Sequence, residues 1–161
     1  MSAISRAYND KKIEMKKLAL SFLFAASIAL LATCAMAGTE TYDTKVGEFT
    51  ILVPDGWKGQ AIPAGCAVQT PDGANALTVQ LVPAEDMTAM DAANKMAEAA
   101  KVKVNSRNDD GNAVFLDCDK DGLPWGILMI VTNDVLIAAQ FAGRDRDGMM
   151  RIYDTLKRKQ P

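Results

Sequence analysis

One apolar segment near the start of the chain limits what the rest of it can fold into. About twenty residues without a charge follow Lys16 and Lys17, and the segment closes on Ala35-Met36-Ala37. A basic start, an apolar centre and two small residues before a cleavage point are typical of a secretory signal peptide. We therefore expect residues 1–37 to be an N-terminal extension and cleavable signal, with Ala35 and Ala37 read by signal peptidase. The protein is then predicted to be periplasmic or secreted.

Other interpretations of this segment stay open. A retained membrane helix needs about 20 apolar residues, and the segment is long enough. Cys34 lies at the end of a sequence similar to a lipid-attachment site, although Thr33 stands where Gly, Ala or Ser is usual. Residues 1–14 are polar, so either the basic start is long or translation begins at Met15. In each case we expect membrane contact only through this segment, if it is retained or lipidated.

The remainder, residues 38–161, has the length of a single domain. The chain has 20 acidic and 18 basic residues, and five of the basic ones precede residue 38, so the domain has a net negative charge. Such a charge repels a phosphate backbone, and we expect no nucleic-acid partner. The basic run Lys157-Arg158-Lys159 is predicted to lie on the last turn of a helix, where cations meet the negative end of the helix dipole.

Two cysteines, Cys66 and Cys118, belong to this domain. In an oxidising exported compartment an isolated pair is expected to form a disulfide, which would stabilise the domain by about 4 kcal/mol on the chain-entropy model. The Cys-x-x-Cys spacing of thiol-disulfide catalysts is absent, so a redox role is not indicated. Two buried unpaired thiols are the alternative.

Alternating apolar residues predict strands along the domain. The first is Phe49–Val53, which Pro54-Asp55-Gly56 ends, and the stretch 58–65, rich in Gly and Pro, is predicted to be irregular. The other predicted strands are 77–81, 102–106, 112–118, 125–131 and 135–141. Short turns join the last four strands, so they are expected to form an antiparallel meander.

Two helices are predicted from apolar residues three and four positions apart. The first begins after Thr88, which forms a capping box with Asp91, and ends before Val102. The second is capped by Asp145 or Asp147, and its apolar stripe is Met149, Ile152, Tyr153 and Leu156. Two helices packed on an antiparallel sheet of about six strands make an α+β domain.

The stretch FTILVPDGW, from Phe49 to Trp57, is a strand that runs into Pro-x-Gly-Trp. With the order strand, helix, meander, helix, it resembles the PsbP-like family, which includes the extrinsic photosystem II subunit and its exported bacterial relatives. The resemblance implies an α/β/α sandwich and a non-catalytic module that docks on or stabilises a larger partner, because the members lack a common active site. The metal-binding histidines of photosynthetic members have no counterpart, since this chain has no His.

The domain also lacks the residue types of common catalytic centres. Without His, and with Ser106 as the only serine after Ala37, neither a Ser-His-Asp nor a Cys-His centre can form, nor a His-ligated zinc site. The carboxylate pairs Glu85-Asp86 and Asp109-Asp110 are predicted to serve at a helix start and in a turn. We therefore expect no enzymatic activity and no cofactor.

Three carboxylates at alternate positions, Asp117, Asp119 and Asp121, reproduce the first half of a calcium loop. The second half fails, because Leu128 stands where a bidentate Glu is required and Pro124 interrupts the loop. A hairpin with a solvated face is the simpler interpretation. Two functions are thus predicted: an exported accessory module that docks to a protein partner in the cell envelope or, as the alternative, a protein or enzyme that binds Ca²⁺ or another metal through these three residues.

Overall fold

The computed structural model describes residues 37–159 of the chain. The predicted signal segment, with Cys34 and Ala35, lies outside these residues, and Ala37 is the first residue described. Among the described helices none is both long and apolar enough to cross a membrane.

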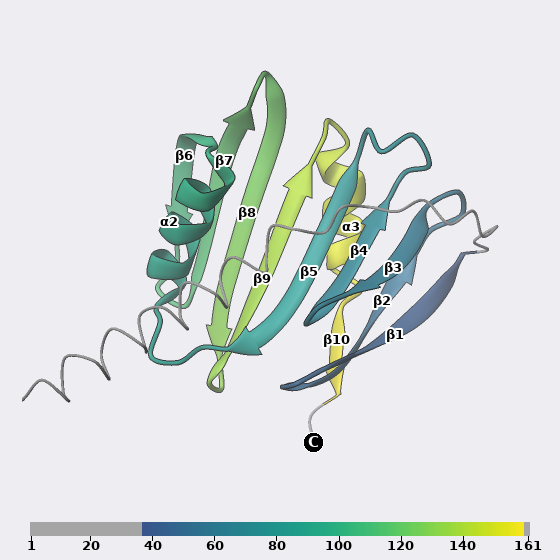
Figure 1. Ribbon diagram of the computed structural model, residues 1–161, viewed down its shortest axis with the longest axis horizontal. Coiled ribbons are helices and arrows are strands. Elements are labelled where there is room, and N and C mark those ends of the chain that lie inside the picture. The colour runs from purple at the N-terminus through teal and green to yellow at the C-terminus, as the bar shows by residue number, and fades with distance from the viewer. Residues whose placement is uncertain (1–36, 160–161) are drawn as a thin grey trace, which may run out of the picture.

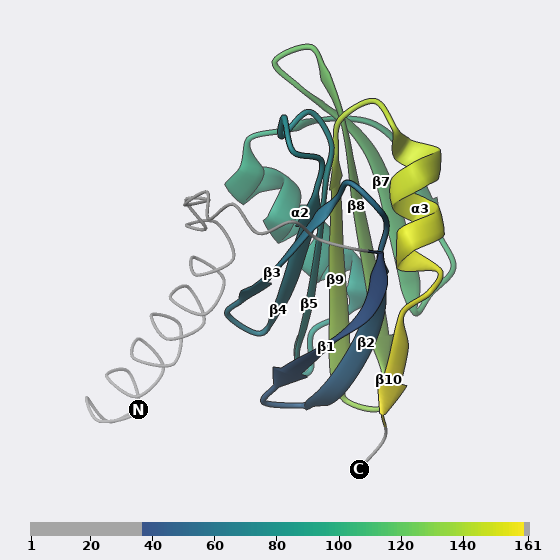
Figure 2. The same cartoon turned by 90° about the vertical axis from the view of Figure 1, so that its right-hand side faces the viewer.

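Two antiparallel sheets and two helices build the domain (Figure 1). The small sheet has the strand order β1-β2-β10, and the large sheet has the order β3-β4-β5-β9-β8-β7-β6. In Figure 2, α2 lies on one side of the large sheet, and α3 lies on the other side together with the small sheet. The elements are β1 (Gly38–Thr44), β2 (Gly47–Val53), β3 (Lys58–Ile62), β4 (Gly65–Gln69), β5 (Ala76–Pro83), α2 (Ala89–Ala100), β6 (Lys103–Asp109), β7 (Ala113–Lys120), β8 (Leu123–Thr132), β9 (Val135–Ala142), α3 (Arg146–Tyr153) and β10 (Lys157–Lys159). The predicted α+β class and the meander of β6 to β9 are confirmed.

Two hydrophobic cores lie on opposite faces of the large sheet. The first core, between the two sheets and α3, contains Tyr42, Phe49, Ile51, Val53, Cys66, Val68, Leu77, Val79, Leu81, Val135, Ile137, Ala139, Phe141, Met149 and Ile152. The second core, under α2, contains Ala84, Ala89, Ala92, Ala93, Met96, Ala97, Val114, Leu116, Cys118, Ile127, Met129, Leu136 and Ala138. The central strand β9 contributes to both cores, which explains its almost unbroken apolar sequence.

The start of α2 follows the predicted capping pattern. The Thr88 hydroxyl accepts a hydrogen bond of 3.0 Å from the Asp91 backbone N–H, and Lys101 ends the helix in the left-handed region with φ of 53°. The small residues Ala92, Ala93 and Ala97 face the large sheet, so the helix can approach the sheet closely.

We expect Thr88→Ala to lower the free energy of unfolding by about 1 kcal/mol, because an N-terminal N–H of the helix loses its acceptor. Urea unfolding followed by circular dichroism measures this loss. Thr88→Ser keeps the hydroxyl and is the control. An equal loss in both variants would show that the cap does not cause the effect.

The observed strands differ from the sequence predictions in three places. The stretch 58–65 is not irregular: it forms the β3–β4 hairpin, in which Ala64 adopts a φ of 63° at the turn. Lys157-Arg158-Lys159 is not helical, because α3 ends at Tyr153 and the three residues pair with β2 as β10. Residues 37–159 form ten strands rather than about six, and β1 is a further strand that the apolar pattern does not indicate.

Candidate functional site

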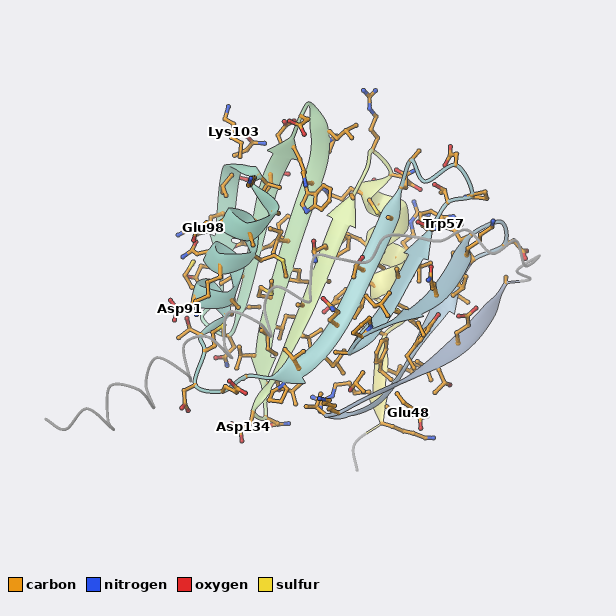
Figure 3. The ribbon with its side chains drawn as sticks, viewed as in Figure 1. Glu48, Trp57, Asp91, Glu98, Lys103 and Asp134 are labelled. Atoms are coloured by element: carbon orange, nitrogen blue, oxygen red, sulfur yellow. The ribbon has the colours of Figure 1, made fainter. Side chains whose placement is uncertain are left out.

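A groove opens where the end of β2 meets α3. Its volume is about 310 Å³, and it is lined by Leu52, Pro54, Trp57, Asp145, Gly148, Arg151 and Ile152. The turn after β2 directs the chain into this groove: the Trp57 N–H donates to the Pro54 carbonyl over 3.0 Å, and Gly56 has a φ of +78°, which favours glycine. Trp57 is labelled in Figure 3. The Pro-Asp-Gly-Trp motif of the sequence thus builds one wall of the groove.

The start of α3 builds the opposite wall. Asp145 Oδ1 accepts a hydrogen bond of 3.0 Å from the Gly148 N–H, so the predicted cap at Asp145 is confirmed. The Asp145 N–H donates to Asn75 Oδ1 over 2.9 Å, which holds the helix start against the β4–β5 loop. A Cβ at residue 148 would clash with the Asp145 carboxylate in its capping position, so glycine leaves room for the cap. This wall is therefore fixed by two hydrogen bonds, one through the backbone N–H of Asp145 and one through its side chain.

The groove offers an apolar floor and few polar groups. Ile152 is buried, and Leu52 is 36% exposed at the rim. The Leu52 N–H donates to Thr155 Oγ1 over 2.9 Å, so the rim is held in place. Arg151 forms no salt bridge with any residue that the structure describes. Such a site can bury an apolar side chain of a bound molecule, whereas it holds no nucleophile paired with a base.

Sequence reasoning did not identify this groove as a site. It placed Trp57 after a turn and Asp145 at a helix start, but these residues belong to segments far apart in the chain. No local pattern indicates that the two segments meet.

The predicted disulfide is not formed: Cys66 and Cys118 are free thiols. They are buried on opposite faces of the large sheet. Cys66 lies on β4 and Cys118 on β7, with β5, β9 and β8 between them. Neighbouring strands are about 4.8 Å apart, whereas a disulfide needs Cα atoms within about 7 Å. The alternative of two buried unpaired thiols is what the structure contains.

Both thiols are held in the protonated form. Burial, and then the nearby Glu40 carboxylate, raises the pKa of Cys66 to about 12. Burial, and then Asp117, raises the pKa of Cys118. The Tyr42 hydroxyl donates a hydrogen bond to the Glu40 carboxylate. Burial, and then this hydrogen bond, likewise raise the pKa of Tyr42. Because the thiolate is the reactive form, neither cysteine is suited to nucleophilic chemistry at neutral pH.

We expect an alkylating reagent at pH 8 to leave Cys66 and Cys118 unmodified in the folded protein and to modify both after unfolding without a reductant. Burial excludes the reagent and the raised pKa values keep the thiols protonated. Mass spectrometry of peptides that contain each cysteine measures this. Recovery of one disulfide-linked peptide pair would contradict the structure.

The structure does not bring Asp117, Asp119 and Asp121 together. Asp117 pairs with Arg146 over 2.6 Å, and Asp119 Oδ1 accepts a hydrogen bond of 2.9 Å from the Gly122 N–H within the β7–β8 turn. Asp121 occupies that turn with a φ of 54°. Among the residues described, no group of three or more acidic, cysteine or histidine side chains could hold a metal ion. The predicted calcium site is thus not formed, and the carboxylates serve a hairpin and an ion pair.

The comparison with known proteins identifies the fold. The sequence matches no protein-family model and no curated protein. The structure is similar to the solution structure of cyanobacterial PsbP (CyanoP) from Synechocystis sp. PCC 6803, with a TM-score of 0.52 and 16% sequence identity, over 82% of this chain and 99% of that one. The chain therefore has the PsbP-like fold, as the Phe49–Trp57 stretch predicts, and at this identity the similarity concerns the fold alone.

Proposed function

From the PsbP-like fold, we propose that this protein is an exported, non-enzymatic accessory module that binds a protein partner in the cell envelope. The groove between β2 and α3 is the proposed binding site. The single observation that carries this proposal is an apolar groove of about 310 Å³ with the exposed Leu52 at its rim.

The contacts of the groove support binding rather than catalysis. Asp145, which could act as an acid or base, already accepts the Gly148 N–H, and Arg151 cannot be deprotonated in proteins. Burial of a leucine-sized side chain of the partner against Trp57 and Ile152 would contribute about 1.5–3 kcal/mol to binding. The hydrogen bonds that fix both walls reduce the ordering that binding would otherwise require.

A photoreactive amino acid at residue 52 tests the proposal. In the envelope fraction of the native host, irradiation is expected to join the protein to one abundant partner. The matched control carries the same amino acid at residue 123, which is the more exposed leucine at 52% and lies outside the groove.

A second variant tests whether the groove makes the contact. Trp57→Ala removes one wall, and it should reduce the yield of the residue 52 product at least tenfold while urea unfolding confirms that the domain is folded. Equal products from residues 52 and 123, or an undiminished product with Trp57→Ala, would overturn the proposal.

A further inference from the structure

The large sheet has two outer strands, β3 and β6, at opposite ends of the strand order (Figure 1). At β3 the small sheet lies close by, because the side chains of Glu40 and Tyr42 on β1 lie against Gly59. At β6 all seven residues are exposed. An unpaired strand edge presents backbone N–H and C=O groups that can pair with another chain. Among residues 37–159, β6 is therefore the open edge of the large sheet.

A β-bulge divides β6 into two parts. The register with β7 shifts between Val104 and Ser106, which leaves Asn105 without a partner on β7. A bulge interrupts pairing and so protects the first part of the edge. From Ser106 to Asp109, each residue pairs with one residue of β7. This second part, residues 106–109, is regular enough to accept a further strand.

The turn after β6 determines which backbone groups point outward. The Asp110 N–H donates to the Ala113 carbonyl over 2.8 Å. In an antiparallel pair of strands, hydrogen-bonded and non-hydrogen-bonded residues alternate. Counted back from Asp110, Asn108 therefore bonds to β7, whereas Arg107 and Asp109 direct their N–H and C=O groups away from it. The open edge thus offers two donors and two acceptors at these two residues.

The side chains of Arg107 and Asp109 share the face of the sheet that carries α2. Arg107 pairs with Leu116, and Leu116 belongs to the second core. Asp109 pairs with Val114, which belongs to the same core. Arg107 Nη2 donates to Asn94 Oδ1 on α2 over 3.0 Å, and neither Arg107 nor Asp109 forms a salt bridge within the described part of the chain. Since α2 packs mainly over β7 and β8, it leaves β6 accessible from the side.

We propose that β6 pairs with β6 of a second copy of this chain, antiparallel and about a two-fold axis at Asn108. In this register Arg107 of each copy lies opposite Asp109 of the other, and each such pair exchanges two backbone hydrogen bonds. Opposite charges directly across two strands stabilise their pairing, and here one strand supplies both charges. The contact is therefore self-complementary and closes as a dimer. The inference is independent of the partner proposed for the groove.

Charge also selects this register over its neighbour. An axis at Arg107 would satisfy the same alternation of hydrogen bonds, but it would place the two Arg107 side chains opposite each other. Like charges in that position destabilise a pair of strands. The axis at Asn108 is thus the register that the charges of the open edge favour.

Charge reversal tests the pairing through the oligomeric state of the full chain, measured by sedimentation velocity over a range of concentrations. Arg107→Asp or Asp109→Arg alone creates two like-charge pairs, so each should raise the dissociation constant of the dimer at least tenfold. An equal mixture of the two variants restores opposite charges and should dimerise as the parent does. Lys103→Asp, on β6 but before the bulge, is the matched control and should change nothing. Circular dichroism confirms that each variant is folded.

A monomer at every concentration would overturn the proposal. A dimer that both reversals leave unchanged would also overturn it, since another segment would then make the contact. A mixture that associates no better than its two components would do the same, because the two charges would then not face each other.

A disulfide across the proposed axis tests the register. In a Cys34→Ser background, Asn108→Cys places two thiols in a non-hydrogen-bonded pair with Cα atoms about 4.5 Å apart, so air and copper phenanthroline should link the two copies. Ser106→Cys is the control, because the two Ser106 residues would lie four positions apart at about 3.4 Å per position. Cys66 and Cys118 are buried and do not interfere. Absence of a link at residue 108, or equal links at residues 106 and 108, would overturn the proposed register.

Discussion

Replacing Phe141 by Ala is expected to lower the free energy of unfolding by about 3–5 kcal/mol, the range for large aromatic residues in a core. Phe141 is 1% exposed on the central strand β9. Its ring centroid lies 6.2 Å from that of Phe115 on β7 and 6.0 Å from that of Tyr153 on α3. The variant therefore loses contacts among three elements and leaves a cavity between them. Urea unfolding measures the change.

Phe115→Ala is the control for this prediction. Phe115 is only partly buried at the margin of the first core, so Phe115→Ala should lower the free energy of unfolding clearly less than Phe141→Ala does. It also removes the aromatic face beneath Arg146, whose guanidinium carbon lies 5.6 Å from the ring centroid. Equal losses for the two variants would show that the margin of this core is as tightly packed as its centre, contrary to the structure.

Alkaline pH is expected to destabilise the domain by several kcal/mol. The pKa of Cys66 rises from 9.0 to about 12 on folding, first through burial and then through Glu40. The folded state therefore binds this proton more tightly, and the stability it contributes is complete below pH 9 and is lost as the pH rises toward 12. For this residue alone the loss is about 4 kcal/mol. Tyr42, whose pKa is also raised, adds a loss of the same sign.

Urea unfolding at several pH values between 7 and 11 measures this dependence. Cys66→Ala removes the thiol, so its stability should fall less steeply above pH 9 than that of the parent, although its stability at pH 7 is lower. Parallel pH curves for parent and variant would contradict the assignment to Cys66.

Much of the fold could be predicted because its signals are local. The alternation of Phe49, Ile51 and Val53 indicates β2, and Thr88 and Asp145 mark the helix starts through hydrogen bonds within one turn. The strands that were missed have no such signal. β10 consists of three basic residues, and it is a strand because Lys157 pairs with Thr50 of β2. Only the packed domain determines that pairing.

The candidate site was harder to predict than the fold for the same reason. The groove joins the turn at Pro54 to α3 at Ile152, and no spacing in the sequence brings them together. The disulfide prediction failed because it required the strand order: the number of cysteines is visible in the sequence, but the three strands between β4 and β7 are not. Absence of histidine excluded His-dependent catalysis, but it did not indicate a binding surface.

The place of β10 in the small sheet affects the order in which the domain can form. β2 is synthesised long before β10. Among the residues that the structure describes, one edge of β2 is covered only by Lys157–Lys159, and Lys159 Nζ holds Glu48 Oε1 at 3.0 Å across that junction. Until these three residues have been synthesised, the small sheet keeps an open edge, and contacts this distant in sequence form slowly. A growing chain that has not yet reached β10 therefore exposes an unpaired strand edge, the kind of surface that makes folding intermediates prone to aggregate.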